Sequence, residues 1–454
     1  MAVALSIVFA LAAIGVVRQE RRRWGARGFA SPLSLTAVSW FFYFGIAGLG
    51  GFATAAADRR LGSEPMNLVT ALAVCMLSLV LVVIGYRLVT RRAVLPSAAS
   101  AAVGPLAIKP GGLYLILAVG WAARLYLLES GHFGFLSGGE TYTGPINRLV
   151  QAAAAGLTIG LVVLVIAAWS PAGMRGMTRG ASRRLLVANL APLVLTSAAS
   201  GLKGQLFTEV VPLAVAYLMV RGRVPWRAVA AVAVYLILIY SGTQDYRTEI
   251  LVGNLDASER VGVVNSVRNS LTSVTSGWGT DTPVENAQSL WRHLTGQYSE
   301  MLTNLAIILH RTPEEVPFLG NRRLITGPVF FLPTSLLGDH ELNITRYVNV
   351  VYRDSTATSS SPPTQPGDFY LSGGWPTLVV GQIMVGVFTG ALWQLVVLRH
   401  RSSVGIVVYA AVSAVFVTAG LDWATLSRGL LQTVGVAWIT MALIRRRDPI
   451  GAGT

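Results

Sequence analysis

The chain alternates long apolar stretches with short polar connections over most of its length. A helix rises about 1.5 Å per residue, so it needs about 20 apolar residues to cross the hydrocarbon core of a bilayer. About eleven stretches come near that length, and we therefore predict an all-α polytopic membrane protein. The predicted spans are 2–17, 31–56, 66–88, 111–129, 148–168, 185–200, 205–220, 226–242, 375–397, 403–421 and 426–444.

Composition supports this prediction. Of the 454 residues 53% are hydrophobic and only 13% are charged, and the mean hydropathy is +0.57. These values lie well outside the range of a soluble globular domain. The first apolar stretch is followed by the basic run RQERRRWGAR and has no basic residue before it. A secretory signal has the reverse charge order, so we expect a retained span.

The basic residues predict the orientation of the spans. Of the 36 Lys and Arg residues, 21 lie in alternate connections, after spans 1, 3, 5, 7, 9 and 11. Because basic residues concentrate on the cytoplasmic side of a membrane, these connections are expected to be cytoplasmic. The amino terminus is then outside and the carboxy terminus inside.

One long hydrophilic connection divides the chain into three parts: spans 1–8 in 1–242, an extracytoplasmic loop domain at 243–374, and spans 9–11 with a tail in 375–454. The loop holds 13 of the 21 acidic residues. The net charge of +15 therefore comes from short basic turns, not from a basic face, and we expect no nucleic-acid partner. The predicted cytoplasmic turns are too short for a nucleotide-binding domain, so a substrate site is expected to face outward.

The long loop contains a predicted amphipathic helix. The sequence LWRHLTGQYSEMLTNLAIILH places apolar residues at three-to-four spacing, which is typical of a helix with one apolar face. Two interpretations remain open: a helix that packs against the membrane bundle, or a lid over a groove that admits a lipid tail. The residues of the apolar face are Leu290, Leu294, Tyr298, Met301, Leu305, Ile308 and Leu309.

The cysteine and histidine residues show no spacing that is typical of a metal site or a disulfide. Cys75 is its single cysteine, and the five histidines form no HxxxH or HExxH pair. No zinc site, nucleotide-sugar metal site or disulfide framework can be read from these residues, and no cofactor is predicted.

Ionisable residues at the ends of spans are costly and are therefore candidates for function. Arg124, Arg428 and Lys203 lie near the predicted outer ends, together with the acids Glu209 and Asp422. A single cation of this kind can also reach the membrane interface for solvation alone. Lys203 is one of only two lysines and is flanked by Gly201 and Gly204, whose flexibility allows a bend toward a site.

An enzyme that builds a polymer outside the cytoplasm has no nucleotide pool, so its donor must already be carried on a lipid. A polyprenyl pyrophosphate carrier is an anion that Lys and Arg side chains bind and stabilise as a leaving group. Further candidates for this contact lie where the loop meets the membrane. They are Arg247 in TQDYRTE and the pair Arg322 and Arg323 in FLGNRRLITG.

Residues 185–430 resemble the Wzy-type oligosaccharide repeat-unit polymerases, the O-antigen polymerase class. The resemblance is carried by LTNLAIILHRTPEEVPFLGNRRLITGPVFFLPTSLLGD and SSPPTQPGDFYLSGGWPTLVVGQIMVGVFTG. SGLKGQ is similar to the cationic outer turn of that family. Relatives often have a basic residue after the loop proline, where this chain has Thr334, so Arg322 or Arg323 would have to supply that charge. The matching positions are Thr312, Pro313, Gly320, Pro333, Asp368, Tyr370, Gly373 and Gly374.

The resemblance implies a glycosyltransferase-C-like, polymerase-ligase architecture and a metal-independent glycosyl transfer. A glycan on undecaprenyl pyrophosphate would move to a second lipid-linked repeat unit, with Asp368 as the base and His310 as the alternative base. Tyr370 and the cations named above would bind glycan and pyrophosphate. Expected partners are lipid-linked oligosaccharides, the bilayer, and other assembly proteins such as a flippase or chain-length regulator. Two alternatives stay open: a glycan ligase of the same architecture, or a non-enzymatic transporter of lipid-linked glycan.

Overall fold

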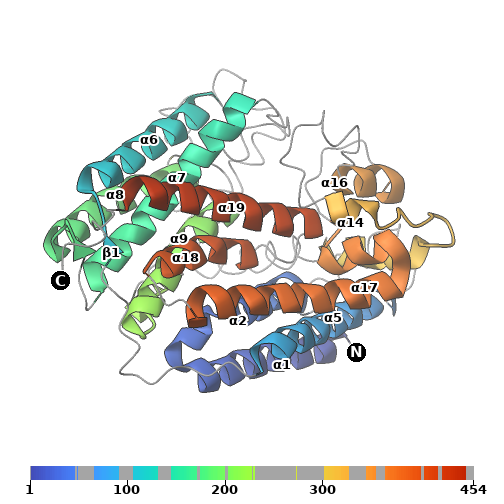
Figure 1. Ribbon diagram of the computed structural model, residues 1–454. Coiled ribbons are helices and arrows are strands. Elements are labelled where there is room, and N and C mark those ends of the chain that lie inside the picture. Colours follow the sequence, from blue (N-terminus) through green and yellow to red (C-terminus); the bar gives the residue numbers. More distant parts are fainter. Residues whose placement is uncertain are drawn as a thin grey trace. The chain divides into compact units, whose positions relative to one another are not determined.

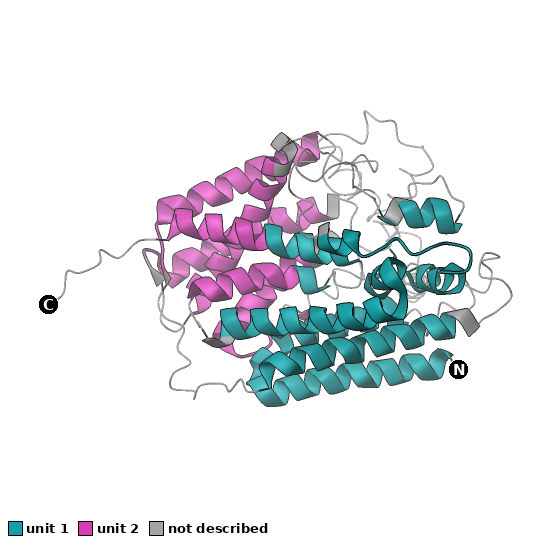
Figure 2. Ribbon diagram, turned by 45° about the vertical axis from the view of Figure 1, so that its right-hand side comes forward, with its two compact units in different colours: residues 1–95, 291–399, 415–432 teal, residues 96–290, 400–414, 433–454 magenta. Residues whose placement is uncertain are grey.

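The computed structural model is built almost entirely of helices (Figure 1). It describes residues 2–46, 49, 66–91, 106–130, 145–170, 174–199, 203–227, 229–230, 272, 301–326, 344–353, 363–399, 403–417 and 422–445. The described chain forms two compact units (Figure 2). Unit 1 contains residues 1–95, 291–399 and 415–432, and unit 2 contains residues 96–290, 400–414 and 433–454.

The protein is an all-α membrane protein by the length and apolarity of its helices. Among the described residues, six helices are long and apolar enough to cross a bilayer, and Ser403–Val417 is a shorter apolar helix. These six cover Ala2–Ala30, Leu68–Thr90, Pro110–Glu129, Leu149–Trp169, Gln365–Val397 and Trp423–Ile444.

Most predicted spans agree with a helix. The helix α5 (Met66–Thr90) and the helix α6 (Pro110–Glu129) match their predicted spans within about two residues at each end. Two spans were predicted too short, because α1 (Ala2–Trp24) and α8 (Arg179–Ala199) continue into neighbouring arginines. Long Arg stems can pack along a helix, so charge alone does not end one. The predicted span 226–242 lies mostly outside the described residues.

Unit 1 is built on α1, α5 and the long helix α17 (Gln365–Leu392), which lie side by side in Figure 2. α5 and α17 run in the same direction, because Val82 faces Gly386 and, one turn on, Tyr86 faces Gly390. A Cβ at Gly386 would lie 2.1 Å from the carbonyl oxygen of Val82. Small residues at this spacing let two helix backbones approach closely, which is how membrane helices pack. The other elements of unit 1 are η1 (Gly25–Ala30), α2 (Pro32–Trp40), η2 (Phe41–Gly45), α14 (Arg322–Thr326), α16 (Ile344–Tyr347), η7 (Val348–Tyr352), η8 (Trp393–Arg399) and the start of α19 (Trp423–Ile444).

The carboxyl ends of α1 and α5 are joined by a buried acid. Glu20 on α1 is fully buried and pairs with Arg87 at 3.0 Å. Its second oxygen accepts hydrogen bonds from Trp24 at 2.9 Å and Tyr86 at 3.0 Å. A buried carboxylate is tolerated only when charge and hydrogen bonds compensate it, so this cluster fixes the register of α1 and α5.

Unit 2 contains α6, α7 (Pro145–Trp169), α8, α9 (Lys203–Arg221), most of α18 (Ser403–Val417) and the end of α19. α6 and α7 are antiparallel, because Gly120 packs on Leu157 and Gly160 packs on Leu117. α8 runs parallel to α6, because the contacts advance along both helices in the same direction. Trp121 is bonded to Asn189 at 2.6 Å, and Arg124, one turn further along α6, is bonded to Thr196, about two turns further along α8.

Three connections that the basic residues assign to one side of the membrane meet in unit 2. The two-residue strand β1 (Leu106–Ala107) pairs in parallel with β2 (Met174–Arg175), and Ile108 bridges to Arg445 after α19. Lys109 donates its backbone N–H to the carbonyl of Ile444 at 2.7 Å. α6 therefore begins, and α7 and α19 end, near this small sheet.

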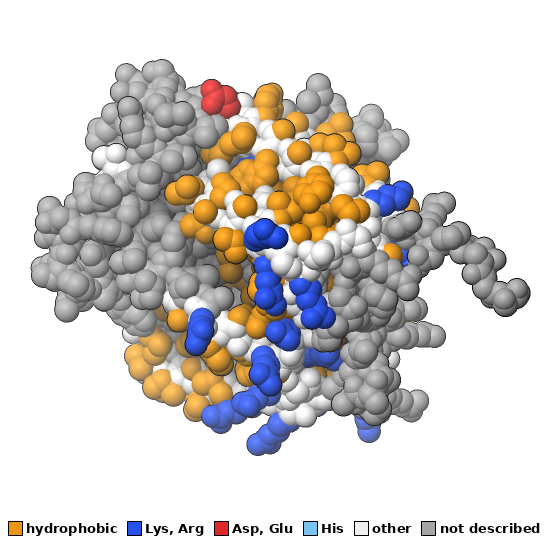
Figure 3. Space-filling view, turned by 90° about the vertical axis from the view of Figure 1, so that its left-hand side faces the viewer, with side chains coloured by type: hydrophobic (Ala, Val, Ile, Leu, Met, Phe, Trp, Pro, Cys, Tyr) orange, Lys and Arg blue, Asp and Glu red, His pale blue; other side chains and the backbone are white. Residues whose placement is uncertain are grey.

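Apolar side chains cover much of the outer surface. On α1, Val3, Ile7, Leu11 and Ile14 are each about half exposed and follow one face of the helix, whereas Phe9 is fully buried on the other. Figure 3 shows one face of the molecule, where hydrophobic side chains alternate with patches in which Lys and Arg are the main charged groups. An apolar surface of this extent is expected where lipid, not water, is the solvent.

Candidate functional site

The residues that carry the family resemblance gather around the first turns of α17. Tyr370 donates its hydroxyl to the carbonyl of Thr312 at 3.2 Å, and Leu319 donates its backbone N–H to the carbonyl of Leu371 at 2.9 Å. The Thr312 hydroxyl pairs with the hydroxyl of Tyr352 at 2.6 Å. Three stretches far apart in the sequence are therefore held together by hydrogen bonds in unit 1.

The start of α17 follows from the sequence TQPGD. Thr364 is the N-cap, with a φ of 70°, and its side chain accepts the backbone N–H of Gly367 at 3.2 Å. Pro366 suits the first turn because the proline nitrogen has no hydrogen to donate, and Asp368 complements the positive end of the helix dipole. A non-glycine residue with positive φ is uncommon and clusters at functional sites.

Asp368 is fully buried and joins α17 to α19. Its Oδ2 accepts the backbone N–H of Trp423, the first residue of α19, at 3.0 Å. Asp422 lies at the same helix terminus and accepts from the backbone N–H of Thr425 at 2.7 Å. The contact between Asp368 and Trp423 is of the kind that stabilises the start of a helix. A carboxylate has further lone pairs, so Asp368 can accept the Trp423 N–H and still act as a base.

Helix α17 breaks where the sequence places the boundary between loop and span. Gly373 (φ −176°, ψ 31°) and Gly374 (φ 70°, ψ −156°) leave helical geometry. The ψ of Gly373 and the positive φ of Gly374 separate a short helix that carries Asp368 and Tyr370 from the long helix that continues to Leu392. The break therefore places the candidate base and tyrosine on a helical segment distinct from the long helix that follows.

The loop helix is described over residues 301–311 and packs onto this short helix. Leu305 and Ile308 are fully buried, and each reaches within 3.4 Å of the position that a Cβ of Gly367 would occupy. Leu302 and Ile307 are buried as well. This part of the helix therefore packs on the start of α17, and its buried surface is wider than the single stripe that the spacing predicted.

His310, the alternative base, is exposed near the end of that helix. Its neighbour Arg311 was missed by the sequence analysis. Arg311 donates to the carbonyls of Val351 at 3.2 Å and Tyr352 at 3.0 Å, and it also bonds Glu315 at 2.6 Å. Burial raises the pKa of Tyr352 to about 12, so its hydroxyl stays protonated at neutral pH.

Gln365 was also missed, and no motif in the sequence marks it. This first residue of α17 is fully buried, and neither its Oε1 nor its Nε2 has a hydrogen-bond partner in the described structure. It lies one helical turn before Asp368. An unpartnered buried amide is costly and calls for an explanation, which a bound ligand would supply.

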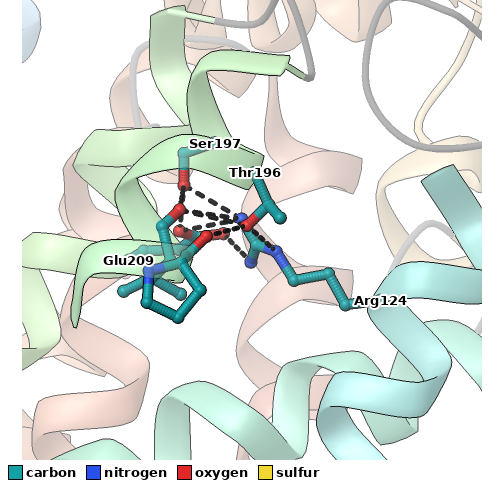
Figure 4. A network of polar contacts seen from close by, with 6 residues as sticks. Arg124, Thr196, Ser197 and Glu209 are labelled. Carbon is teal, nitrogen blue, oxygen red and sulfur yellow. Dashed lines mark hydrogen bonds and ion pairs between the residues drawn. The ribbon is translucent and has the colours of Figure 1, made fainter. Parts of the chain in front are cut away.

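A second polar cluster lies in unit 2 (Figure 4). Arg124 on α6 is buried and bonds both carboxylate oxygens of Glu209 on α9, at 2.5 Å and 3.3 Å. It also donates to Thr196 at 2.6 Å and Ser197 at 2.9 Å on α8. Arg124 thus ties three helices together at the end of the unit where α9 begins.

The remaining predicted cations are placed only in part. Lys203 is the first residue of α9, but its side chain and all of Arg247 lie outside the described residues. Arg322 is exposed at the start of α14, while the side chain of Arg323 is also not described, and Arg428 is half-buried on α19. The predicted site residues are divided between the two units. Unit 2 contains Arg124 and Lys203, and unit 1 contains Asp368, Tyr370, His310, Arg322 and Arg428. Of the predicted site, Asp368 and Tyr370 lie on the same short helix of unit 1.

Within the described residues no group of three or more His, Cys, Asp or Glu could hold a metal ion. Comparison with family models, curated proteins and solved structures found no match for this chain. The site is therefore interpreted from its own geometry and from the resemblance given above.

Proposed function

We propose that this protein is a membrane glycosyltransferase that polymerises undecaprenyl-pyrophosphate-linked oligosaccharide repeat units on the outer face of the bacterial cytoplasmic membrane. The observation that carries the proposal is that the short helix with Asp368 and Tyr370 is tied to Thr312 through Tyr370 and to the start of α19 through Asp368. Thr312 and Tyr370 come from two separate stretches of the resemblance, and nothing in the sequence alone requires them to meet.

In this proposal Asp368 accepts the proton of the acceptor hydroxyl. A base must reach the proton that it abstracts, and burial strengthens its hydrogen bond to that proton. The contact with Trp423 holds one carboxylate oxygen in place, which fixes the direction of the group. Tyr370, hydrogen-bonded to the carbonyl of Thr312, lines the same short helix. The proposed leaving group is undecaprenyl pyrophosphate, whose charge Lys203 and the loop arginines would stabilise.

The test is chain growth by purified protein in lipid nanodiscs with a defined lipid-linked repeat unit. Asp368→Asn should abolish chain growth while keeping an acceptor oxygen for the N–H of Trp423. The matched control is Asp422→Asn, because Asp422 caps the same helix α19. Equal specific activity in the two variants would show that Asp368 is only a cap. Loss of activity in His310→Gln but not in Asp368→Asn would transfer the role of base to His310.

The products separate this proposal from its two alternatives. A polymerase lengthens glycan on the lipid carrier and gives a ladder of repeat-unit multiples. A ligase instead moves glycan from the carrier to a different acceptor, and a transporter changes the side of the membrane on which the lipid-linked unit is found without lengthening it. Intact repeat units recovered on the carrier after full incubation would rule out the polymerase.

A further inference from the structure

Three aromatic rings meet where α17 breaks. The ring centroids of Phe318 and Tyr370 lie 6.0 Å apart, and those of Tyr370 and Trp375 lie 5.4 Å apart, both at nearly perpendicular angles. Tyr370 is buried, whereas Phe318 is 41% and Trp375 is 46% exposed. Tyr370 is therefore the buried ring of the three, and the side chains of Phe318 and Trp375 are accessible from outside.

The two glycines of the break create this arrangement. A Cβ at Gly374 would lie 3.0 Å from Cζ of Phe318, and the φ of 70° there is one that side chains rarely adopt. A Cβ at Gly373 would lie 2.4 Å from the hydroxyl of Thr377. Bare backbone is thus needed at Gly374 for the close approach of Phe318 and at Gly373 for the position of Thr377.

A polar pair borders the rings. Thr377 donates its hydroxyl to Oδ1 of Asn321 at 3.2 Å, on the exposed side of the structure. Asn321 would lie 3.1 Å from a Cβ at Gly373, so this pair sits directly beside the break. We refer to Phe318, Asn321, Tyr370, Trp375 and Thr377 as the break surface.

The break surface is uncharged, with aromatic rings beside amide and hydroxyl groups. A ligand that fits it has an apolar C–H face to lie on the rings and hydroxyl groups at its edges to bond the amide, and a sugar ring has both. We propose that the break surface binds the glycan part of a lipid-linked oligosaccharide. This inference rests on the proposed function, and it adds a glycan-binding surface whose Tyr370 lies on the same short helix as Asp368.

Aromatic side chains at the end of a span also occur as anchors at the membrane interface. The polar pair and the paired glycines distinguish the break surface from such an anchor, because an anchor needs neither a fixed partner amide nor a backbone break. Trp438 on α19 is 69% exposed and carries no comparable set among the described contacts, so it is the matched control for a lipid-facing tryptophan.

The experiment measures binding of the soluble oligosaccharide repeat unit, released from its lipid carrier by mild acid, to the full-length protein in nanodiscs. Saturation-transfer NMR detects the contact, and titration gives Kd. Trp375→Leu should raise Kd about tenfold, the loss expected for one aromatic contact of about 1.4 kcal/mol. Thr377→Val, which keeps the shape of the side chain, should raise Kd by about threefold. Trp438→Leu should leave Kd unchanged.

Equal Kd for the wild type, Trp375→Leu and Thr377→Val would overturn the proposal, as would an absence of binding to the wild type at millimolar oligosaccharide. An equal rise of Kd in Trp438→Leu would overturn it as well, since that outcome indicates a general effect of losing an exposed tryptophan. Binding of soluble glycan needs no catalysis, so failure of the two proposals can be told apart. Protein that binds through Trp375 but never lengthens glycan overturns only the proposed polymerase.

Discussion

Arg124 and Glu209, 85 residues apart in the sequence, form a two-point ion pair that is buried at both ends, with each residue 3% exposed. Glu209 also accepts the hydroxyl of Ser197, so the carboxylate has several donors. A buried ion pair is compensated only while both partners are present. The pair therefore makes α6, α8 and α9 depend on one another.

Removal of either partner should destabilise unit 2 strongly. Arg124→Met leaves Glu209 buried without its cation, and we expect a loss of about 3–5 kcal/mol in the free energy of unfolding. The control is the half-exposed pair of Arg311 and Glu315, where Glu315→Gln should cost less than about 1 kcal/mol. Thermal unfolding in detergent measures both. Normal stability of Arg124→Met together with weak substrate binding would instead favour the predicted contact between Arg124 and pyrophosphate.

Replacement of Gln365 is expected to stabilise the protein, whereas replacement of Arg124 is expected to destabilise it. Because both polar atoms of its amide are buried without a partner, Gln365→Met should raise the free energy of unfolding by about 1–3 kcal/mol. Asn189→Met is the control, since the Asn189 amide is bonded at both Oδ1 and Nδ2, and its loss should destabilise. If Gln365 contacts substrate, the more stable variant will also have a higher KM. A fall in stability would show that the amide has a partner in the folded protein.

Helices such as α5 could be predicted because the apolar pattern that marks them is local in the sequence. The contacts of the site could not be predicted, since they join residues that are far apart in the chain. The stretch at 66–88 became α5, and the proposed loop boundary at residue 374 falls on the break at Gly374. By contrast, no local pattern pairs Arg124 with Glu209, or Asp368 with Trp423. Arg311 was missed for the same reason, since one arginine in a polar loop is unremarkable until its carbonyl partners 40 residues later are known.

Deprotonation of Tyr352 is expected to lower the stability of the folded protein at high pH. Its pKa is raised to about 12 by burial, above the value near 10 of an unfolded chain. A raised pKa favours the protonated folded state, so this contribution is complete below about pH 10 and is lost as pH rises toward 12. Unfolding of wild type and Tyr352→Phe should be compared at pH 9 and pH 11. The wild type should lose more stability between these values than the variant, and equal losses would contradict the assignment to Tyr352.

Lys203 begins α9, about two helical turns before Glu209. If its ammonium binds the pyrophosphate, charge is the property that matters. Lys203→Arg should keep substantial activity, and Lys203→Met, similar in length and uncharged, should lose most of it. One charge-assisted hydrogen bond contributes about 1.5–3 kcal/mol, which corresponds to a roughly ten- to hundredfold fall in rate.

The chain supplies its own control for this substitution. Lys109, the only other lysine, lies beside the small sheet, where its backbone N–H bonds the carbonyl of Ile444. Lys109→Met should leave chain growth per molecule unchanged, because that side chain lies at the opposite end of unit 2 from the start of α9. The measurement is polymerisation per unit of purified, monodisperse protein. If Lys203 only anchors a helix end at the membrane interface, Lys203→Met will lower the yield of folded protein and retain full specific activity, and that result would end the pyrophosphate hypothesis for this residue.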